Sequence, residues 1–253
     1  MDNLFDKIEL ISVNYKTPDF IIKQYYNIRK FIGNINIRII DGSGFVVEEL
    51  DKIEQTDTNF KIIYFDFNIH HGPGMDYALR TSKFPYLLIM DSDCWPVKPN
   101  LLVDMWKLME NDIYGVAYLN TNKYGCKYMN AYCMLLNRQI YLKYPKFVFH
   151  GAPLKDLHSE ICKLGISDKI YKNIKISEYT NWSPTNPGRG TRKRYGSDWY
   201  TKRKKEIPVN KKTLEYKELC ILIPPFIKLK SEYSKTKIRI EKPKRLASKR
   251  RRR

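Results

Sequence analysis

Four apolar, β-branched runs in the first hundred residues constrain the fold most, because each has the length and composition of a buried strand. They cover residues 8–14, 36–40, 60–65 and 86–90. Helical spacing of apolar residues follows Pro18, and a second helix is predicted over 75–82. Strands that alternate with helices are typical of an α/β fold, in which a largely parallel sheet is covered on both faces.

The pattern becomes mixed in the second half of the chain. Strands are predicted over 114–119, 131–136 and 169–176, a helix over 154–164, and a loop over 179–200, which is rich in aromatic residues, Gly, Pro and Arg. We therefore predict one α/β domain over residues 1–200, with a mixed, mostly parallel sheet flanked by helices. Residues 201–253 are predicted to be a basic extension with a disordered end.

Most of the net charge lies in that extension. The chain has 46 Lys/Arg and 27 Asp/Glu, a net charge of +19, and residues 201–253 alone contain 20 Lys/Arg and five Asp/Glu, a net charge of +15. A local surplus of this size favours a polyanionic partner, either nucleic acid or an anionic membrane surface. The alternative is a solvated tail without a partner.

The five cysteines are odd in number and widely spaced, without a C-x-x-C pair for zinc binding or redox chemistry. This usage predicts a reduced, cytoplasmic protein. If the protein is viral or from a phage, the compartment is the cytoplasm of the host. The N-terminus has no basic and apolar pattern of a secretory signal, and no apolar run approaches the roughly 20 residues that a transmembrane helix needs.

Polar residues stand where several predicted strands end. Asn14, Asp41 and the pair Asp91 and Asp93 all occupy such positions. The carboxyl ends of parallel strands open on one crevice, where ligands bind, so these side chains are expected to share it. Carboxylates beside a buried strand suit Mg²⁺ or Mn²⁺, which prefer oxygen ligands and keep open positions for a substrate. The alternative for Asp91-Ser92-Asp93 is a surface turn with local capping bonds.

Four blocks in this order carry a resemblance to a known family. They are 11–15 (ISVNY), 38–43 (RIIDGS), 72–79 (GPGMDYAL) and 86–93 (YLLIMDSD). Over residues 8–176 the chain resembles family 2 glycosyltransferases, which have the GT-A fold. The resemblance implies transfer of a sugar from a nucleotide donor, usually UDP-linked, with inversion. By position it implies that Asn14 and Tyr15 lie beside the nucleoside, Asp41 bonds the uracil, Asp91 faces the ribose and Asp93 ligates the metal.

The general base of an inverting transfer is expected on the predicted helix 154–164. Asp156 is our first candidate and Glu160 the second; they are four residues apart and share a helical face. The alternatives are that Asp156 is a favourable charge in the first turn of the helix and that Glu160 is a solvated carboxylate. Arg189 or Arg192, in the aromatic and basic loop, is a candidate contact for the donor diphosphate. His70 and His71 are interpreted as polar turn residues.

The predicted function is therefore metal-dependent, inverting sugar transfer from a UDP-sugar to a hydroxyl of a protein, glycan, lipid or hydroxylated DNA base. The alternative from another class is a nucleic-acid-binding protein on a degenerate transferase scaffold. It is disfavoured because the acidic residues at positions 41, 91 and 93 are intact.

Overall fold

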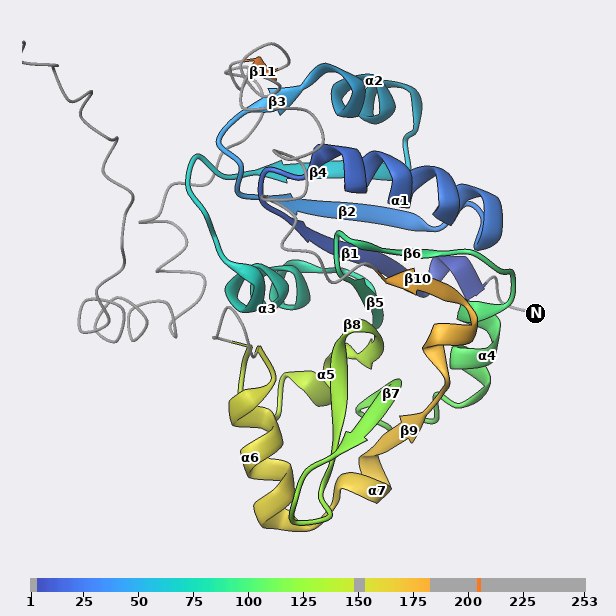
Figure 1. The fold of residues 1–253 in the computed structure, drawn as a ribbon, viewed down its shortest axis with the longest axis vertical. Coiled ribbons are helices and arrows are strands. Elements are labelled where there is room, and N and C mark those ends of the chain that lie inside the picture. The colour runs from blue at the N-terminus through green and yellow to red at the C-terminus, as the bar shows by residue number, and fades with distance from the viewer. Residues whose placement is uncertain (1–3, 148–152, 183–203, 206–253) are drawn as a thin grey trace, which may run out of the picture.

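A seven-stranded sheet forms the centre of the molecule (Figure 1). The structure is a computed structural model that describes residues 4–147, 153–182 and 204–205. In spatial order the strands are β4 (Phe60–Tyr64), β2 (Asn36–Asp41), β1 (Ile8–Asn14), β5 (Tyr86–Met90), β8 (Lys127–Asn137), β7 (Gly115–Thr121) and β9 (Tyr171–Asn173). Only β8 is antiparallel to its neighbours, so the sheet is mixed and mostly parallel, as predicted.

Helices cover both faces of the sheet. They are α1 (Pro18–Phe31), α2 (Glu48–Thr56), α3 (His71–Thr81), α4 (Leu101–Lys107), α5 (Arg138–Tyr141), α6 (Lys155–Leu164) and α7 (Ser167–Ile170), with 3-10 turns at Leu4–Asp6 and Ile176–Glu178. The crossovers through α1 and α2 run one way across the sheet and the crossover through α3 runs back. Right-handed crossovers therefore place α3 on the opposite face, as Figure 1 shows.

The reversal of direction occurs between β1 and β5, which are neighbours in the middle of the sheet. Both strands are almost entirely buried, which explains their continuous apolar sequences. In open α/β sheets ligands bind beyond the carboxyl ends of the strands at such a point. This rule places the expected binding crevice where Asn14 and Asp91 emerge.

Two short strand pairs form small sheets separate from the main one. β6 (Cys94–Pro96) pairs with β10 (Thr180–Trp182), and β3 (Val46–Val47) pairs with β11 (Lys204–Lys205). The start of the loop predicted over 179–200 is thus a strand. Its remainder lies outside the described residues, as does most of the basic extension, so the division at residue 200 stays a prediction.

Two further differences concern helix and strand ends. The segment predicted as a strand over 169–176 is split, because the helix α7 precedes β9. The helix α3 begins at His71, four residues before its predicted start. Pro73 is compatible with this start because the first turn of a helix needs no backbone N–H donor.

A buried ion pair ties α3 to the sheet at the end of β1 opposite the crevice. Arg38 Nη2 lies 2.8 Å from Glu9 Oε2, and the hydroxyl of Ser82 donates to the same carboxylate at 2.7 Å. Arg38 also donates to Thr81 Oγ1 and to the carbonyl of Ala78, at 2.9 and 2.8 Å. These bonds pair the two buried charges with each other and with polar neighbours, although Arg38 Nε has no hydrogen-bond partner among the described residues.

The prediction that all cysteines are reduced is wrong for Cys126 and Cys162, which form a disulfide. They are 36 residues apart in the sequence, but the β7–β8 turn carries Cys126 onto α6. Cys94 and Cys133 are buried and free. Within the described residues, no helix has the length and apolar character needed to cross a bilayer.

Candidate functional site

A chain of buried polar side chains connects the ends of β1, β2 and β5. The side-chain amide nitrogen of Asn14 donates to Asp41 Oδ2 at 2.8 Å, and its side-chain oxygen Oδ1 accepts from the hydroxyl of Thr17 at 2.6 Å. That hydroxyl lies 3.4 Å from the hydroxyl of Ser92. The structure thus brings together Asn14, Asp41 and the Asp91–Asp93 turn, as the sequence predicted.

Asp41 is held in one orientation although it is buried. Its second oxygen accepts from the backbone N–H of Ser43 at 2.7 Å. Burial raises the pKa of Asp41, and the hydrogen bonds from Ser43 and Asn14 oppose that rise. Gly42 fits this turn because a Cβ there would lie 2.8 Å from the carbonyl oxygen of Phe67. The close packing fixes the carboxylate at the end of β2.

The Asp91–Asp93 turn is supported from α1. The backbone N–H of Cys94 donates to the carbonyl of Asp91 at 2.9 Å and closes the turn. The buried side chain of Gln24 donates to the carbonyls of Asp91 and Cys94, at 2.8 and 2.6 Å. Sequence reasoning missed Gln24, because a single polar residue in an amphipathic helix resembles any other.

His71 contacts the first carboxylate of the turn. Its Nε2 atom lies 2.9 Å from Asp91 Oδ1, so the interpretation of His71 as a simple turn residue is incomplete. Burial lowers the pKa of His71, but the charges of Asp91 and Asp93 outweigh it, and the pKa is raised. Asp93 itself is only 7% exposed. The crevice therefore contains two carboxylates and an imidazole that they favour in its protonated form.

Three of the remaining predicted residues, Tyr15, Asp156 and Glu160, lie within the described part of the chain. Tyr15 follows Asn14 and is 42% exposed. Asp156 is exposed in the first turn of α6, and Glu160 is half-buried one turn later. Arg189 lies outside the described residues. Arg80 pairs with the buried carboxylate of Asp76 at 2.9 Å, so it contributes to packing of α3.

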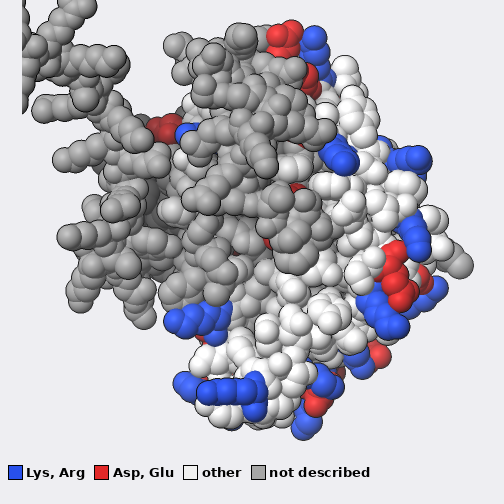
Figure 2. Space-filling model, viewed as in Figure 1, with Lys and Arg blue, Asp and Glu red and all other residues white. Residues whose placement is uncertain are grey.

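The two halves of the described body differ in charge. Residues 4–114, which form the crevice, contain 12 Lys/Arg and 16 Asp/Glu, whereas residues 115–182 contain ten Lys/Arg and four Asp/Glu. Figure 2 shows a group of basic side chains at the lower end of the molecule, where Figure 1 places α6 and α7. The half that carries Asp156 is therefore electropositive.

Comparison with known proteins identifies this fold. The mannosyltransferase PcManGT from Pyrobaculum calidifontis, solved with GDP-Man and Mn²⁺, is similar with a TM-score of 0.55 at 11% identity, over 90% of this chain and 75% of that one. TarS 1–349 from S. aureus is similar with a TM-score of 0.52 at 11% identity, over 93% and 76%. No curated protein matches this sequence. At these identities the likeness shows the fold, which is that of GT-A transferases.

A family match covers the crevice. Residues 11–155, more than half of the 253 residues, match the model of glycosyl transferase family 2. The matched segment begins in β1 and includes Asn14, Asp41, Asp91 and Asp93. The chain therefore belongs to glycosyltransferase family 2 and is a nucleotide-sugar-dependent transferase with the GT-A fold.

Proposed function

We propose that this transferase moves a sugar from a UDP-sugar to a hydroxyl acceptor by direct, inverting displacement. The observation that carries the proposal is the buried pair of Asn14 and Asp41 at the end of β1 and β2. A fixed carboxylate there is suited to accept the imide N–H of uracil, and such charge-assisted bonds are stronger than neutral ones. Guanine also offers an N–H to a carboxylate, so the donor base is part of the test.

The donor set of the turn fits Mg²⁺ or Mn²⁺. Asp91 and Asp93 supply carboxylate oxygens, which hard divalent cations prefer. In our proposal Asp93 ligates the cation and Asp91 faces the ribose. The bound cation supplies electrostatic stabilisation of the charge that develops on the leaving diphosphate. The His71 imidazole lies beside Asp91 at 2.9 Å, and the bonds from Gln24 hold the backbone of the turn in place.

Arg189 is a candidate for a further contact with the diphosphate. β10 pairs with β6, and Trp182 stands opposite Cys94 in this pair. Cys94 directly follows Asp93 in the sequence. Arg189 follows Trp182 by seven residues, which span at most about 25 Å when fully extended. This starting point supports the proposal, because it lies beside the turn that the guanidinium must reach.

The acceptor base is proposed to be Asp156, with Glu160 as the alternative. A carboxylate at either position takes the proton of the acceptor hydroxyl as the hydroxyl oxygen attacks the anomeric carbon and the diphosphate leaves. The excess of basic residues over 115–182 supports an acceptor that carries negative charge. Protein, glycan, lipid and hydroxylated DNA base acceptors remain the candidate classes.

The test begins with donor binding and slow hydrolysis. UDP with Mn²⁺ should raise the Tm, and one UDP-sugar in a panel of nucleotide sugars should be hydrolysed only with a divalent cation. Asp93→Ala should lower metal-dependent turnover by roughly 10³-fold or more, because the leaving diphosphate loses its cation. Asp112→Ala is the matched control, since it removes an exposed carboxylate from another loop.

Three results would contradict the proposal. Binding of GDP but not UDP would refute the donor assignment. Unchanged turnover of Asp93→Ala at saturating Mn²⁺ would refute the metal role. Binding of nucleic acid without any binding or hydrolysis of nucleotide sugars would favour the degenerate scaffold.

A further inference from the structure

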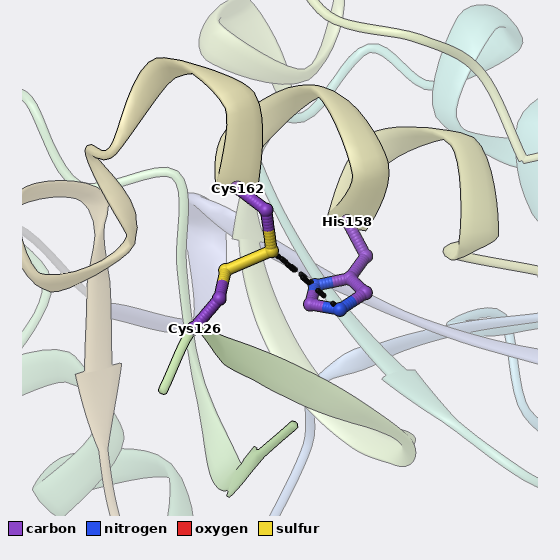
Figure 3. Close-up of side chains that lie close together, drawn as sticks. All are labelled: Cys126, His158 and Cys162. Atoms are coloured by element: carbon purple, nitrogen blue, oxygen red, sulfur yellow. Dashed lines mark hydrogen bonds between the residues drawn. A yellow bond between two sulfur atoms is a disulfide. The ribbon is translucent and has the colours of Figure 1, made fainter. Parts of the chain in front are cut away.

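Three metal-ligating side chains meet outside the crevice, where the turn of the β7–β8 hairpin contacts α6 (Figure 3). His158 and Cys162 are four residues apart on α6 and therefore share one face of the helix. Cys126 comes from the hairpin. One ligand atom from each of the three lies within 4.8 Å of the others. The cluster joins α6 to the β7–β8 turn, and the proposed sugar transfer assigns no role to that turn.

The distance between imidazole and sulfur matches that between two ligands of one zinc ion. Cys162 Sγ lies 3.4 Å from Nδ1 and 3.6 Å from Nε2 of His158. Zinc binds nitrogen at about 2.0–2.1 Å and sulfur at about 2.3 Å, so two tetrahedral ligands of these kinds lie about 3.6 Å apart. Burial lowers the pKa of His158, which keeps a lone pair available at neutral pH.

Neighbouring side chains position the imidazole. Asn122 Oδ1 accepts from the backbone N–H groups of Tyr124 and Cys126, at 2.9 and 3.0 Å. Its amide nitrogen therefore faces His158 and donates to Nε2 at 3.2 Å, so Nε2 carries the lone pair of the neutral ring, and a zinc ion bound at Nε2 replaces this hydrogen bond. The ring of Tyr128 packs against the imidazole with the centroids 4.8 Å apart. The ring is thus held beside the sulfurs by contacts that do not involve the crevice.

The disulfide determines when the cluster can bind a cation. Oxidised sulfurs offer no thiolate, whereas a dithiol reductant that is itself oxidised to a disulfide supplies two electrons and two protons and yields two thiols. A zinc ion then displaces the two thiol protons as it binds. The Cα atoms of Cys126 and Cys162 are 5.7 Å apart, so rotation of the side chains can separate the sulfurs to the roughly 3.8 Å expected between two zinc-bound thiolates.

We propose that Cys126, His158 and Cys162 of the reduced protein bind one zinc ion, and that the disulfide is the metal-free, oxidised form of the same site. Two sulfurs and one nitrogen select a soft cation, unlike the carboxylates of the crevice, which select Mn²⁺ or Mg²⁺. Three protein ligands leave a fourth position for water. This inference is independent of the proposed sugar transfer.

Cobalt is the probe, because Co²⁺ replaces Zn²⁺ and thiolate ligands give it a near-ultraviolet charge-transfer absorption. The protein is reduced with a water-soluble phosphine, which converts the disulfide and one water to two thiols and a phosphine oxide. The phosphine is then removed without air. Reduced wild type should bind one equivalent of Co²⁺ with this absorption, and Zn²⁺ should abolish the absorption. The oxidised protein should give none.

Variants assign the ligands. Cys162→Ser should abolish the absorption, and His158→Ala should weaken the affinity for Co²⁺ at least 10-fold, since loss of even a group that only orients a ligand costs 10- to 100-fold. Two controls should retain the absorption: Asp93→Ala, and Cys220→Ser, which changes the fifth cysteine of the sequence, outside the described residues. Zn²⁺ should also raise the Tm of reduced wild type more than that of reduced His158→Ala.

Three results would overturn the proposal. They are the lack of thiolate absorption in reduced wild type, its persistence in Cys162→Ser, and equal Co²⁺ affinity of wild type and His158→Ala. Circular dichroism of each variant distinguishes the loss of a ligand from the loss of the fold.

Discussion

The support of the Asp91–Asp93 turn by Gln24 can be tested by Gln24→Met, which keeps the side-chain volume and removes both donors. One partly buried and one buried hydrogen bond are lost, and each contributes a net of about 0.5–1.5 kcal/mol. Part of this loss is recovered, because Gln24 Oε1 has no partner among the described residues and its removal relieves a buried acceptor. The free energy of unfolding should therefore fall by about 1–2 kcal/mol, or roughly 5- to 30-fold in the unfolding equilibrium.

Gln55→Met provides the matched control. Gln55 is exposed on α2 and donates to Asp51 at 3.0 Å, so the same substitution there should change stability by less than about 0.5 kcal/mol. Urea denaturation measures both variants, and calorimetry with UDP and Mn²⁺ measures nucleotide affinity. Gln24→Met should bind UDP several-fold more weakly than Gln55→Met. Equal stability of the two variants would refute the hydrogen-bond argument, and equal UDP affinity would refute the support of the turn.

Three other predictions concern the base, the imidazole and the basic extension. Asp156→Asn should leave UDP binding unchanged and lower transfer about 10²- to 10⁴-fold; the same result for Glu160→Gln alone would move the base by one helical turn. The pKa of His71 is raised in the folded protein, so protonation of His71 stabilises the fold. This contribution is complete below the pKa of histidine in the unfolded chain, about 6.5, and is lost as the pH rises through the pKa of His71 in the folded protein. Wild type should therefore lose more stability than His71→Gln in urea denaturation between pH 6 and 8, and parallel profiles would contradict this. If about six phosphates are neutralised, DNA affinity should fall roughly 10³-fold between 50 and 200 mM salt, and removal of residues 249–253 should flatten that slope; negligible binding to DNA and to anionic vesicles at 50 mM salt would indicate a tail without a partner.

The strands and the crevice could be predicted because their signals are local. β1, β2, β4 and β5 are short apolar runs; β1 and β2 end in Asn14 and Asp41, Asp91 follows β5 directly, and the rule for parallel sheets places these ends together. The helices α2 and α4 were not predicted. α2 buries only Leu50 and Ile53, which is too weak an apolar pattern to stand out from a loop.

Contacts between distant segments could not be predicted. His71 was assigned to a turn because its partner Asp91 lies on another strand–loop unit. The pairing of Cys126 with Cys162 depends on how the β7–β8 hairpin bends toward α6, which cysteine spacing does not contain. Spacing rules for metal sites apply to ligands within one short motif, so they missed a cluster made by a hairpin and a helix.

The buried pair of Glu9 and Arg38 constrains how this sequence can evolve. Loss of either partner alone leaves an uncompensated buried charge and costs about 3–5 kcal/mol, whereas replacement of both by apolar residues of similar volume is often neutral or stabilising by about 1–4 kcal/mol. A lineage that changes one position first must therefore pass through a poorly folded intermediate. The two positions are coupled by selection although neither faces the crevice, and the acid and the base should be inherited or lost together.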